Sequence, residues 1–456
     1  MKGFKKVFAL LIVLVTAFVL ISCDKDKAEK KLVIRAWNDE FQGLFRKYYP
    51  DFKETKADGT DVLKDGTIVK WVIVANENNA YQIALDEALK NQESVYEEER
   101  IDMFLVEADY ALKYVDSDYS LPVADLGITT DDLKNQYAYT QKVMTSSDGK
   151  LKGLSWQATP GLYAYRQDIA EEVFGKVGIT PEEVQAKISD WTKFEAVAAQ
   201  MKAKGYTMLA GNDDAYRTFS NNVSAPWVNA NKEIVVDQNI LNWIEQTKRF
   251  ADAGYNNQGA DYALWGPGWQ KEQGPTGKTF GFFYSTWGIN FTLMGNSLGD
   301  SKAEKKVGNG LFGKYRVVTG PQSYYWGGSW LVSTKFTDQK DLVKDIMMKF
   351  TFDKDIMKSI TLDTLDYTNN KVAMGEIAND PTYGSAFLGG QNHIKLFAEA
   401  AEKIDLKTLS IYDQGLNEGI QTAMKGYFAG DITLEKAWEN FYDGIKALYP
   451  SLKKKS

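Results

Sequence analysis

Six tryptophans lie in loop-like segments and are the side chains best suited to binding a ring-shaped ligand. A flat indole stacks on an apolar face of C–H groups, while the hydroxyls around a sugar ring are bound by carboxylates and amides. The Gly-Pro-Gly centre between Trp265 and Trp269 disfavours a regular helix there. Each tryptophan alone suits core packing as well as ligand contact, but we expect at least three of the set to line a ligand site. The set is Trp37, Trp227, Trp265, Trp269, Trp287 and Trp326.

Polar side chains follow the strand-like runs of the first half of the chain. Asn38, Asp39 and Glu40 follow the first apolar run of the mature chain, and Asp109 follows a later one. Ligands of open α/β sheets bind beyond the carboxyl ends of the strands, so we expect these side chains to accept hydrogen bonds from ligand hydroxyls. Asp39 is equally well placed to cap a helix. By the same reasoning, three asparagines follow another strand: Asn76, Asn78 and Asn79.

Tyr165 and Arg166 complete the candidate binding set. They end a strand-like run and precede a helix-like segment. The guanidinium of Arg166 is able to donate two parallel hydrogen bonds to hydroxyls or to an acidic sugar. An ion pair within its own part of the fold is an equally good interpretation of Arg166.

The scarcity of cysteine and histidine excludes several kinds of site. Cys23 is the only cysteine and His393 the only histidine in 456 residues. If Cys23 is modified at the N-terminus, the folded part has no thiol for a disulfide, a zinc site or nucleophilic catalysis. A histidine cluster is impossible as well. We therefore expect no metal and no cofactor.

The charge of the chain disfavours nucleic acid as a partner. The first 22 residues contain three lysines and no acidic residue, so 51 basic and 61 acidic residues remain, a formal charge of −10. Nucleic-acid-binding proteins carry basic stripes that neutralise phosphates. The mature chain has no such stripe apart from its C-terminal lysines.

The N-terminus is typical of an exported protein. Three lysines precede an apolar run of about 15 residues, which is short for a transmembrane helix and suits a signal peptide over residues 1–22. Leu20-Ile21-Ser22-Cys23 resembles the bacterial lipobox, in which the cysteine is acylated and becomes the new N-terminus. This resemblance implies a lipid at Cys23, a short tether over residues 23–31, and anchoring to the outer face of the cytoplasmic membrane.

Strand-like and helix-like segments alternate through the first third of the mature chain. Apolar runs at 32–37, 67–75 and 101–106 are separated by helical patterns at 41–49 and 81–89. This alternation predicts a parallel α/β layer. About 430 residues exceed what one hydrophobic core usually serves, so two lobes are expected.

Several blocks together resemble the extracellular solute-binding proteins of bacterial carbohydrate importers, the maltodextrin-binding type. Residues 32–52 are similar to that family's opening strand, tryptophan, polar loop and helix. Residues 148–154 and 328–333 resemble its crossover segments, and residues 426–437 resemble its last helix pair. The order and spacing of the blocks make the resemblance specific. Arg166 departs from the family's usual asparagine, which puts the ligand in doubt more than the fold.

The resemblance implies a two-lobed periplasmic-binding-protein-like fold of type II, class α/β. Each lobe would be a mostly parallel sheet flanked by helices, with hinge crossovers near Thr159, Gly327 and Gly384. The lobes would close on a ligand in the cleft by hinge bending. The expected first lobe is residues 32–158 plus 329–383, and the second is residues 159–328 plus 384–456.

The same resemblance implies a monomeric binding protein that captures an oligosaccharide outside the cell and delivers it to an ABC permease, with no enzymatic activity. Two alternatives remain open from the residues. A lipoprotein glycoside hydrolase would need two carboxylates at a fixed separation, and the chain has many acids. A solute-binding protein for a polyamine or a peptide would also suit an acidic, aromatic cleft.

Overall fold

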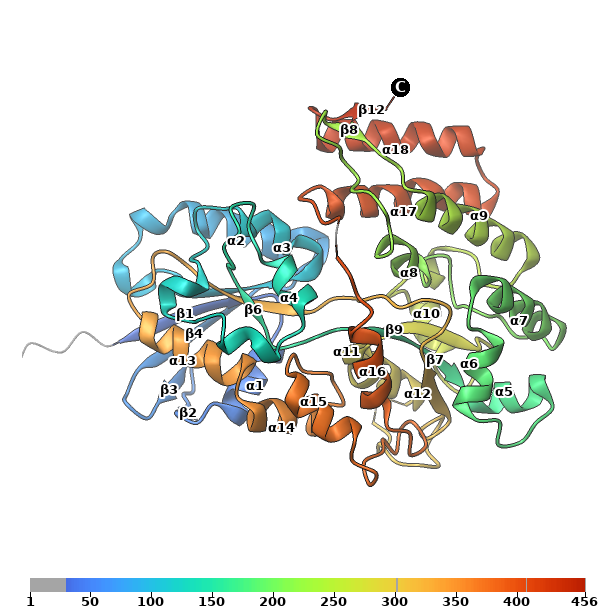
Figure 1. Ribbon diagram of the computed structural model, residues 1–456, viewed down its shortest axis with the longest axis horizontal. Coiled ribbons are helices and arrows are strands. Elements are labelled where there is room, and N and C mark those ends of the chain that lie inside the picture. The colour runs from blue at the N-terminus through green and yellow to red at the C-terminus, as the bar shows by residue number, and fades with distance from the viewer. Residues whose placement is uncertain (1–29, 301, 407, 456) are drawn as a thin grey trace, which may run out of the picture.

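The computed structural model describes residues 30–300, 302–406 and 408–455 and contains two bodies, each with its own β-sheet (Figure 1). We call the body around the larger sheet the first lobe and the body around the smaller sheet the second lobe. Figure 1 shows the first lobe on the left and the second on the right, with the last two helices above it. The two-lobed α/β fold expected from the sequence is confirmed.

The first lobe contains a seven-stranded sheet of β1 (Lys31–Ala36), β2 (Phe52–Thr55), β3 (Asp61–Leu63), β4 (Ile68–Ile73), β5 (Met103–Glu107), β6 (Leu154–Ser155) and β11 (Ser329–Ser333). Its order is β2-β3-β4-β1-β5-β11-β6. β1 pairs in parallel with both β4 and β5, whereas β11 runs antiparallel between β5 and β6. The carboxyl ends of β1, β4 and β5 therefore meet at one edge of the sheet.

Amphipathic helices cover this sheet: α1 (Glu40–Tyr48), α2 (Ala80–Lys90), α3 (Ala108–Val115), α4 (Ala138–Val143), α13 (Lys340–Thr351) and α14 (Lys354–Thr364). α1 buries Phe41, Leu44 and Phe45, at the spacing that forms one helix face. The Phe41 ring lies 5.0 Å from the ring of Phe350 in α13. This packing fixes the start of α1, and with it the polar residues that follow β1.

The second lobe contains a three-stranded sheet of β7 (Gly161–Arg166), β9 (Gly281–Ser285) and β10 (Tyr315–Val318), in the order β10-β7-β9. Both pairings are antiparallel, so the expectation of a mostly parallel sheet is wrong for these strands. Parallel contacts in this lobe lie outside the three-stranded sheet, in isolated bridges such as Thr207 with Thr279 and in one pair of two-residue strands near the C-terminus. Every residue of β7 and β9 is buried, which produces the continuous apolar run otherwise typical of parallel strands.

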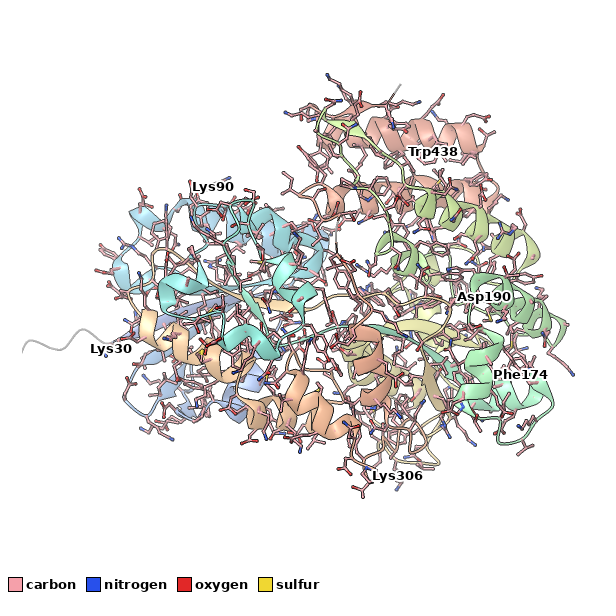
Figure 2. The ribbon with its side chains drawn as sticks, in the orientation of Figure 1. Lys30, Lys90, Phe174, Asp190, Lys306 and Trp438 are labelled. Atoms are coloured by element: carbon pink, nitrogen blue, oxygen red, sulfur yellow. The ribbon has the colours of Figure 1, made fainter. Side chains whose placement is uncertain are left out.

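Helices surround this sheet: α5 (Gln167–Phe174), α6 (Pro181–Lys187), α7 (Trp191–Ala203), α8 (Tyr216–Ser220), α9 (Gln238–Ala253), α10 (Pro267–Glu272), α11 (Thr286–Gly288), α12 (Met294–Ser297), α16 (His393–Ala401), α17 (Asp413–Ala429) and α18 (Leu434–Leu448). Asp190 caps α7 by accepting a hydrogen bond from the Lys193 N–H at 2.8 Å, and it lies at the outer side of the lobe (Figure 2). Two short strands, β8 (Glu233–Ile234) and β12 (Lys453–Lys454), pair and attach the C-terminal residues to this lobe.

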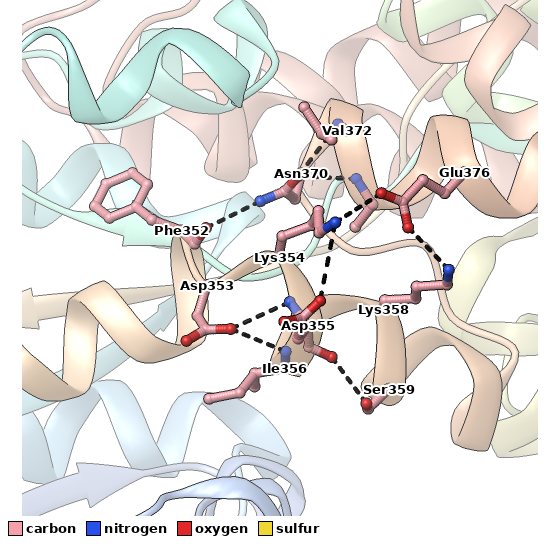
Figure 3. A network of polar contacts seen from close by, with 11 residues as sticks. Phe352, Asp353, Lys354, Asp355, Ile356, Lys358, Ser359, Asn370, Val372 and Glu376 are labelled. Carbon is pink, nitrogen blue, oxygen red and sulfur yellow. Dashed lines mark hydrogen bonds and ion pairs between the residues drawn. The ribbon is translucent and has the colours of Figure 1, made fainter.

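The junction of α14 with α15 (Lys371–Ala378) is fixed by polar contacts (Figure 3). Asp353 accepts hydrogen bonds from two N–H groups at the start of α14, and Asn370 does the same at the start of α15. Glu376 pairs with Lys354 and Lys358, each at 2.8 Å. α14 and α15 therefore form one block between the two lobes.

Three chain segments connect the lobes, namely residues 156–160, 319–328 and 379–392. The first two run side by side, because the Thr159 hydroxyl donates to the Gly327 carbonyl at 2.8 Å and the Trp326 N–H donates to the Thr159 carbonyl at 3.1 Å. Gly327 and Gly328 have φ of 73° and 109°, a backbone conformation that favours glycine. The exact residue limits of the two lobes remain predictions.

Candidate functional site

The carboxyl ends of β1 and β5 place the predicted polar residues of the first lobe along one edge of its sheet. Trp37 lies between β1 and α1, half-buried, with its ring 6.0 Å from the ring of Tyr81 and 6.1 Å from that of Tyr110. The hydroxyl of Tyr110 is buried without a hydrogen-bond partner among the described residues. We call this edge the first wall; it consists of Trp37, Asn38, Asp39, Glu40, Glu107 and Asp109.

Asp39 occupies the capping position of α1, but its side chain makes no capping hydrogen bond. The side chain is exposed, and the structure gives its carboxylate no ion pair or hydrogen bond with the described residues. The neighbouring Asn38 side chain accepts the Glu40 N–H at 3.2 Å and forms the local turn. The helix-cap interpretation of Asp39 therefore holds for its position only, and its carboxylate is available to a ligand.

Asn76, Asn78 and Asn79 follow β4 and approach the same edge. Asn78 and Asn79 have φ of 51° and 63°, so the chain turns sharply here through the left-handed region that asparagine tolerates. The side-chain oxygen of Asn76 is buried without a partner among the described residues.

Glu40 belongs to a hydrogen-bond network that joins both lobes. The side-chain amide of Gln157 donates to Glu40 at 3.0 Å and to Asp366 at 2.7 Å. The hydroxyl of Thr286, in α11 of the second lobe, donates to the other oxygen of Asp366. Surrounding protein, then the charge of Asp366, raises the pKa of Glu40 to about 8, although the side chain keeps contact with solvent. The shift favours the protonated form of Glu40 relative to an ordinary glutamate.

Glu107 and Asp109 lie together at the start of α3. Glu107 caps the helix by accepting the Asp109 N–H at 2.8 Å. Burial, then the charge of Asp109, raises the pKa of Glu107. Asp109 accepts two hydrogen bonds, at 2.8 and 2.6 Å, from the guanidinium of Arg217 in α8 of the second lobe. Burial opposes ionisation of Asp109, but the charge and the hydrogen bonds of Arg217 together outweigh it and lower the pKa of Asp109.

The second wall is a cluster of indoles, Trp265, Trp287 and Trp326. Trp265 stacks on Trp287, with ring centroids 5.8 Å apart and an interplanar angle of 15°. Trp287 meets Trp326 edge-on at 5.1 Å, and its N–H donates to the Trp326 carbonyl at 3.0 Å. Trp265 is 45% exposed, whereas Trp326 is only 6% exposed. The cluster therefore holds its rings by mutual contact and leaves indole surface open to a ligand.

Backbone irregularities occur on both sides of this cluster. Trp265 has a φ of 71°, which is a genuine outlier for a bulky residue. Residues Ile289–Leu293, directly after Trp287, form a π-helical turn that leaves Phe291 71% exposed. Positive φ and π-helical turns both concentrate at functional sites.

The two walls meet at the crossover glycine Gly327. A methyl group placed there would lie 2.8 Å from Nε1 of Trp287 and 3.5 Å from a carboxylate oxygen of Glu107. An indole of one lobe and a carboxylate of the other therefore lie within a few ångströms of the same glycine. We call the two walls together the interlobe site.

A cavity of about 110 Å³ lies beside the Asp109–Arg217 pair, between α3 of the first lobe and α8 and α17 of the second. Drug-sized ligand pockets begin at roughly 300 Å³, so this space suits one small group rather than a whole oligosaccharide. Four carboxylates and one guanidinium line it: Asp109, Asp213, Asp413, Glu418 and Arg217.

Trp227 lines this cavity rather than the indole cluster. It is 5% exposed, and its N–H donates to the side-chain oxygen of Asn417 at 3.0 Å. The hydroxyl of Tyr216 donates to the same oxygen at 2.5 Å. Two donors on one atom identify it as the amide oxygen, so the amide NH₂ of Asn417 is the group left to donate to a ligand.

Tyr165 and Arg166 are placed away from the interlobe site, so including them in the binding set is wrong. Tyr165 is fully buried in β7, and its hydroxyl donates to Gln167 at 3.2 Å. Arg166 pairs with Asp168 at 2.8 and 2.6 Å, which is the alternative ion-pair interpretation. Helices cover both faces of this sheet, so alternate residues of β7 do not point to solvent.

Trp269 is also a core residue rather than a cleft residue. It is fully buried, and its N–H donates to the buried carboxylate of Asp214 at 2.8 Å. The expectation that no helix forms here is wrong, because α10 begins at Pro267. Proline fits the first helical position, where its missing N–H is not needed.

Sequence reasoning missed Glu107 of the interlobe site and two residues beside it, Asp366 and Arg217. Glu107 ends β5, so the rule that selected Asp109 applies to it as well. Asp366 follows α14 rather than a strand, and Arg217 lies in a five-residue helix, so neither has a periodic sequence signal. Their positions depend on tertiary packing.

The remaining sequence expectations concern the N-terminal segment and the absence of a metal site. Cys23, the signal peptide and nearly all of the tether lie outside the described residues. Within the described part of the chain, no three or more His, Cys, Asp or Glu side chains are grouped to hold a metal ion. In the same part, no helix has both the length and the apolar character needed to span a membrane.

Solved structures resemble this chain over nearly its whole length. A crystal structure of an extracellular solute-binding protein of family 1 has a TM-score of 0.70 at 18% identity, covering 92% of this chain and 99% of its own. A binding protein of an ABC transporter from B. animalis subsp. lactis, in complex with β-1,6-galactobiose, has a TM-score of 0.65 at 15% identity, covering 94% and 100%. The galacto-N-biose/lacto-N-biose I-binding protein of Bifidobacterium longum has a TM-score of 0.64 at 15% identity with the same coverage. At these identities the similarity establishes the fold.

Family membership follows from the sequence itself. No curated protein matches the chain. Residues 41–384, well over half of the chain, match the model of the family described as bacterial extracellular solute-binding protein. The matched segment includes the second wall of the interlobe site, and Glu107 and Asp109 of the first. The chain therefore belongs to the bacterial extracellular solute-binding proteins.

Proposed function

We propose that this protein captures an oligosaccharide between its two lobes and delivers it to the permease of an ABC importer. One observation carries the proposal: the indole of Trp287, which packs with Trp265 and Trp326, and a carboxylate oxygen of Glu107 from the other lobe lie beside the same glycine, Gly327. Indole faces suit the C–H faces of sugar rings, and carboxylates and amides suit their hydroxyls. Relatives of the same fold that hold galactobiose or lacto-N-biose are in line with it.

The two walls would divide the work of recognition. Trp265 and Trp287 offer stacking surface, and the exposed Phe291 extends it. Asp39 is free to accept hydrogen bonds from hydroxyls, and protonated Glu40 is able both to donate and to accept. Trp37 would contribute its half-buried face. The protein would perform no covalent chemistry on the sugar.

A thermal-shift screen of residues 24–456 tests the proposal. The panel contains β-1,6-galactobiose, lacto-N-biose, maltose, their monosaccharides, polyamines and short peptides. A ligand that binds only the native state stabilises it by about 2.7 kcal/mol at roughly 100 times its dissociation constant. We expect a raised melting temperature with at least one oligosaccharide, and that sugar should be recovered unchanged.

The other outcomes of the screen are equally informative. Cleavage of the sugar would favour a glycoside hydrolase, in which two carboxylates act across the bond. A shift with a polyamine or a peptide but with no sugar would retain the fold and overturn the ligand class. Glu40 as nucleophile or acid has no specific support, because its nearest carboxylate, Asp366, is already bound by Gln157 and Thr286.

We further propose that Cys23 carries a lipid that anchors a monomeric binding protein to the outer face of the cytoplasmic membrane. The lipobox-like sequence before Cys23 supports the anchor. A tethered receptor stays close to its permease, which raises the effective concentration of the loaded form.

Replacing Cys23 with serine tests the anchor. We expect the C23S protein to be unprocessed or released from membranes, to lose labelling by palmitate, and still to bind its ligand. The parent protein, fractionated in parallel, is the control. Continued palmitate labelling of C23S would contradict the lipid site, and loss of ligand binding would show that the change disturbs the fold.

A further inference from the structure

Arg217 and Asp109 form a bidentate ion pair between the lobes. Asp109 belongs to the first turn of α3 in the first lobe, and Arg217 belongs to α8 in the second. The two nitrogen–oxygen distances are 2.8 and 2.6 Å, one to each carboxylate oxygen. Such fork-to-fork contacts are stronger and more directional than single hydrogen bonds. The pair therefore joins the two lobes directly, in addition to the crossover segments and the hydrogen bond between Thr286 and Asp366.

Contacts other than that with Asp109 also hold the Arg217 guanidinium in position. It lies 5.3 Å from the ring centre of Trp326, in the crossover segment. The preceding residue, Tyr216, packs against Trp243 of α9 at 4.7 Å and donates its hydroxyl to Asn417 of α17. Arg217 therefore projects from a fixed position on the second lobe and pays little additional conformational entropy when it meets Asp109.

The carboxylates around this ion pair would repel one another if the two lobes met without Arg217. Of the charged residues that line the adjacent cavity, Asp109 comes from the first lobe, and Asp213, Asp413 and Glu418 come from the second. Carboxylates that face each other across a closing gap repel. Arg217 is the one cation among the cavity-lining residues, so it turns repulsion between the lobes into attraction.

We propose that Arg217 is the interlobe clamp, a positioning residue that holds the walls of the cleft together through Asp109. In this arrangement the Asp109 carboxylate is committed to Arg217 and does not bind ligand hydroxyls. An anionic ligand would find both fork positions of Arg217 already occupied. The inference rests on the proposed function for its purpose, since the clamp controls access to the same cleft.

Small-angle X-ray scattering of the protein without sugar tests the clamp. The variants are R217Q, D109N and the double variant, compared with the parent protein. We expect a larger radius of gyration for each single variant and no further increase for the double variant. Raising NaCl from about 0.05 M to about 1 M, where the Debye length falls to about 3 Å, should expand the parent and leave R217Q unchanged.

A matched control is available within the second lobe. Arg249 of α9 makes the same kind of two-pronged pair with Glu195 of α7, at 3.1 and 3.0 Å. R249Q should therefore keep the radius of gyration of the parent. Circular dichroism confirms that each variant is folded, and if R217Q unfolds, D109N alone decides the question.

An unchanged radius of gyration in folded D109N or R217Q would overturn the clamp, as would an equal expansion in R249Q. Because the measurement needs no sugar, the clamp can fail while sugar binding is retained. Conversely, if no sugar binds, the radius of gyration measured without sugar still decides whether Arg217 holds the lobes together.

Discussion

Trp265 and Trp269 lie four residues apart, yet they occupy opposite environments. Trp265 is 45% exposed and contributes to the indole cluster of the second wall, whereas Trp269 is fully buried beneath it. Their rings are 5.5 Å apart, so the boundary between the binding surface and the core runs between them. The difference shows that one tryptophan-rich segment places one ring in the core and another at the surface, where the proposed ligand would bind.

The two regions also differ in how their polar atoms are satisfied. The Trp269 N–H donates to Asp214. The Asp214 carboxylate also accepts two backbone N–H groups, so both of its oxygens are hydrogen-bonded within the core. By contrast, Asp39 of the interlobe site and the amide of Asn417 in the adjacent cavity retain hydrogen-bonding capacity. Polar groups in a core hydrogen-bond to one another, whereas a binding site leaves some donors and acceptors unpaired for a ligand.

Replacing Trp269 with alanine should have the largest effect on stability. Removing a fully buried indole leaves a cavity and strips Asp214 of its donor, so we expect a loss of about 3–5 kcal/mol in the free energy of unfolding. Urea unfolding followed by circular dichroism measures it. W265A is the matched control and should lose far less; equal losses would break the comparison between the two residues.

Replacing Trp287 with alanine should have the largest effect on binding. Central aromatic anchors typically contribute about 2 kcal/mol or more, which corresponds to roughly 30-fold in the dissociation constant. Isothermal titration with an oligosaccharide from the screen measures the change. W438A, on the outer helix α18 (Figure 2), should bind like the parent. Unaltered affinity in W287A would remove the indole cluster from the ligand site.

Replacing Trp265 with glycine tests whether its backbone strain serves function. Glycine adopts a φ of 71° without the penalty of about 1–2 kcal/mol that other residues incur. Relief of this strain should offset the lost ring contacts, so we expect W265G to be about 1 kcal/mol more stable than W265A. Both should bind sugar more weakly than the parent. If W265G is no more stable than W265A, the positive φ is not strained.

The sequence indicates where the strands of the first lobe end, because apolar runs followed by acidic residues mark the carboxyl edge of a sheet. That reasoning selects Asp39, Glu40 and Asp109, which lie along this edge, and their contact with a ligand stays a prediction. It fails for Tyr165 and Arg166, since both faces of β7 are buried and the alternation that reveals an exposed face is absent. It also fails for Trp269, where proline starts a helix instead of preventing one. The sequence pattern does not predict the contact made by Arg217, because its partner Asp109 is 108 residues away in the chain.

Glu40 should produce a smaller, pH-dependent effect that distinguishes the cleft from the core. Its folded pKa, about 8, lies above the value near 4.5 expected when the chain is unfolded. The native state therefore binds more protons between these values, and the free energy of unfolding should fall as pH rises from about 4.5 to 8. The exposed side chain reduces the size of this fall. E40Q should flatten it, as measured by thermal unfolding across that pH range; an identical slope in parent and E40Q would contradict the raised pKa.

Isothermal titration of the parent protein and of W287A with the same oligosaccharide tests the central claim most directly. The claim is that the indole cluster of the second lobe forms one wall of a sugar-binding cleft. The account predicts saturable binding to the parent and binding at least roughly 30-fold weaker to a folded W287A. The absence of binding by any oligosaccharide to the parent, or equal affinities for the two proteins, would contradict it.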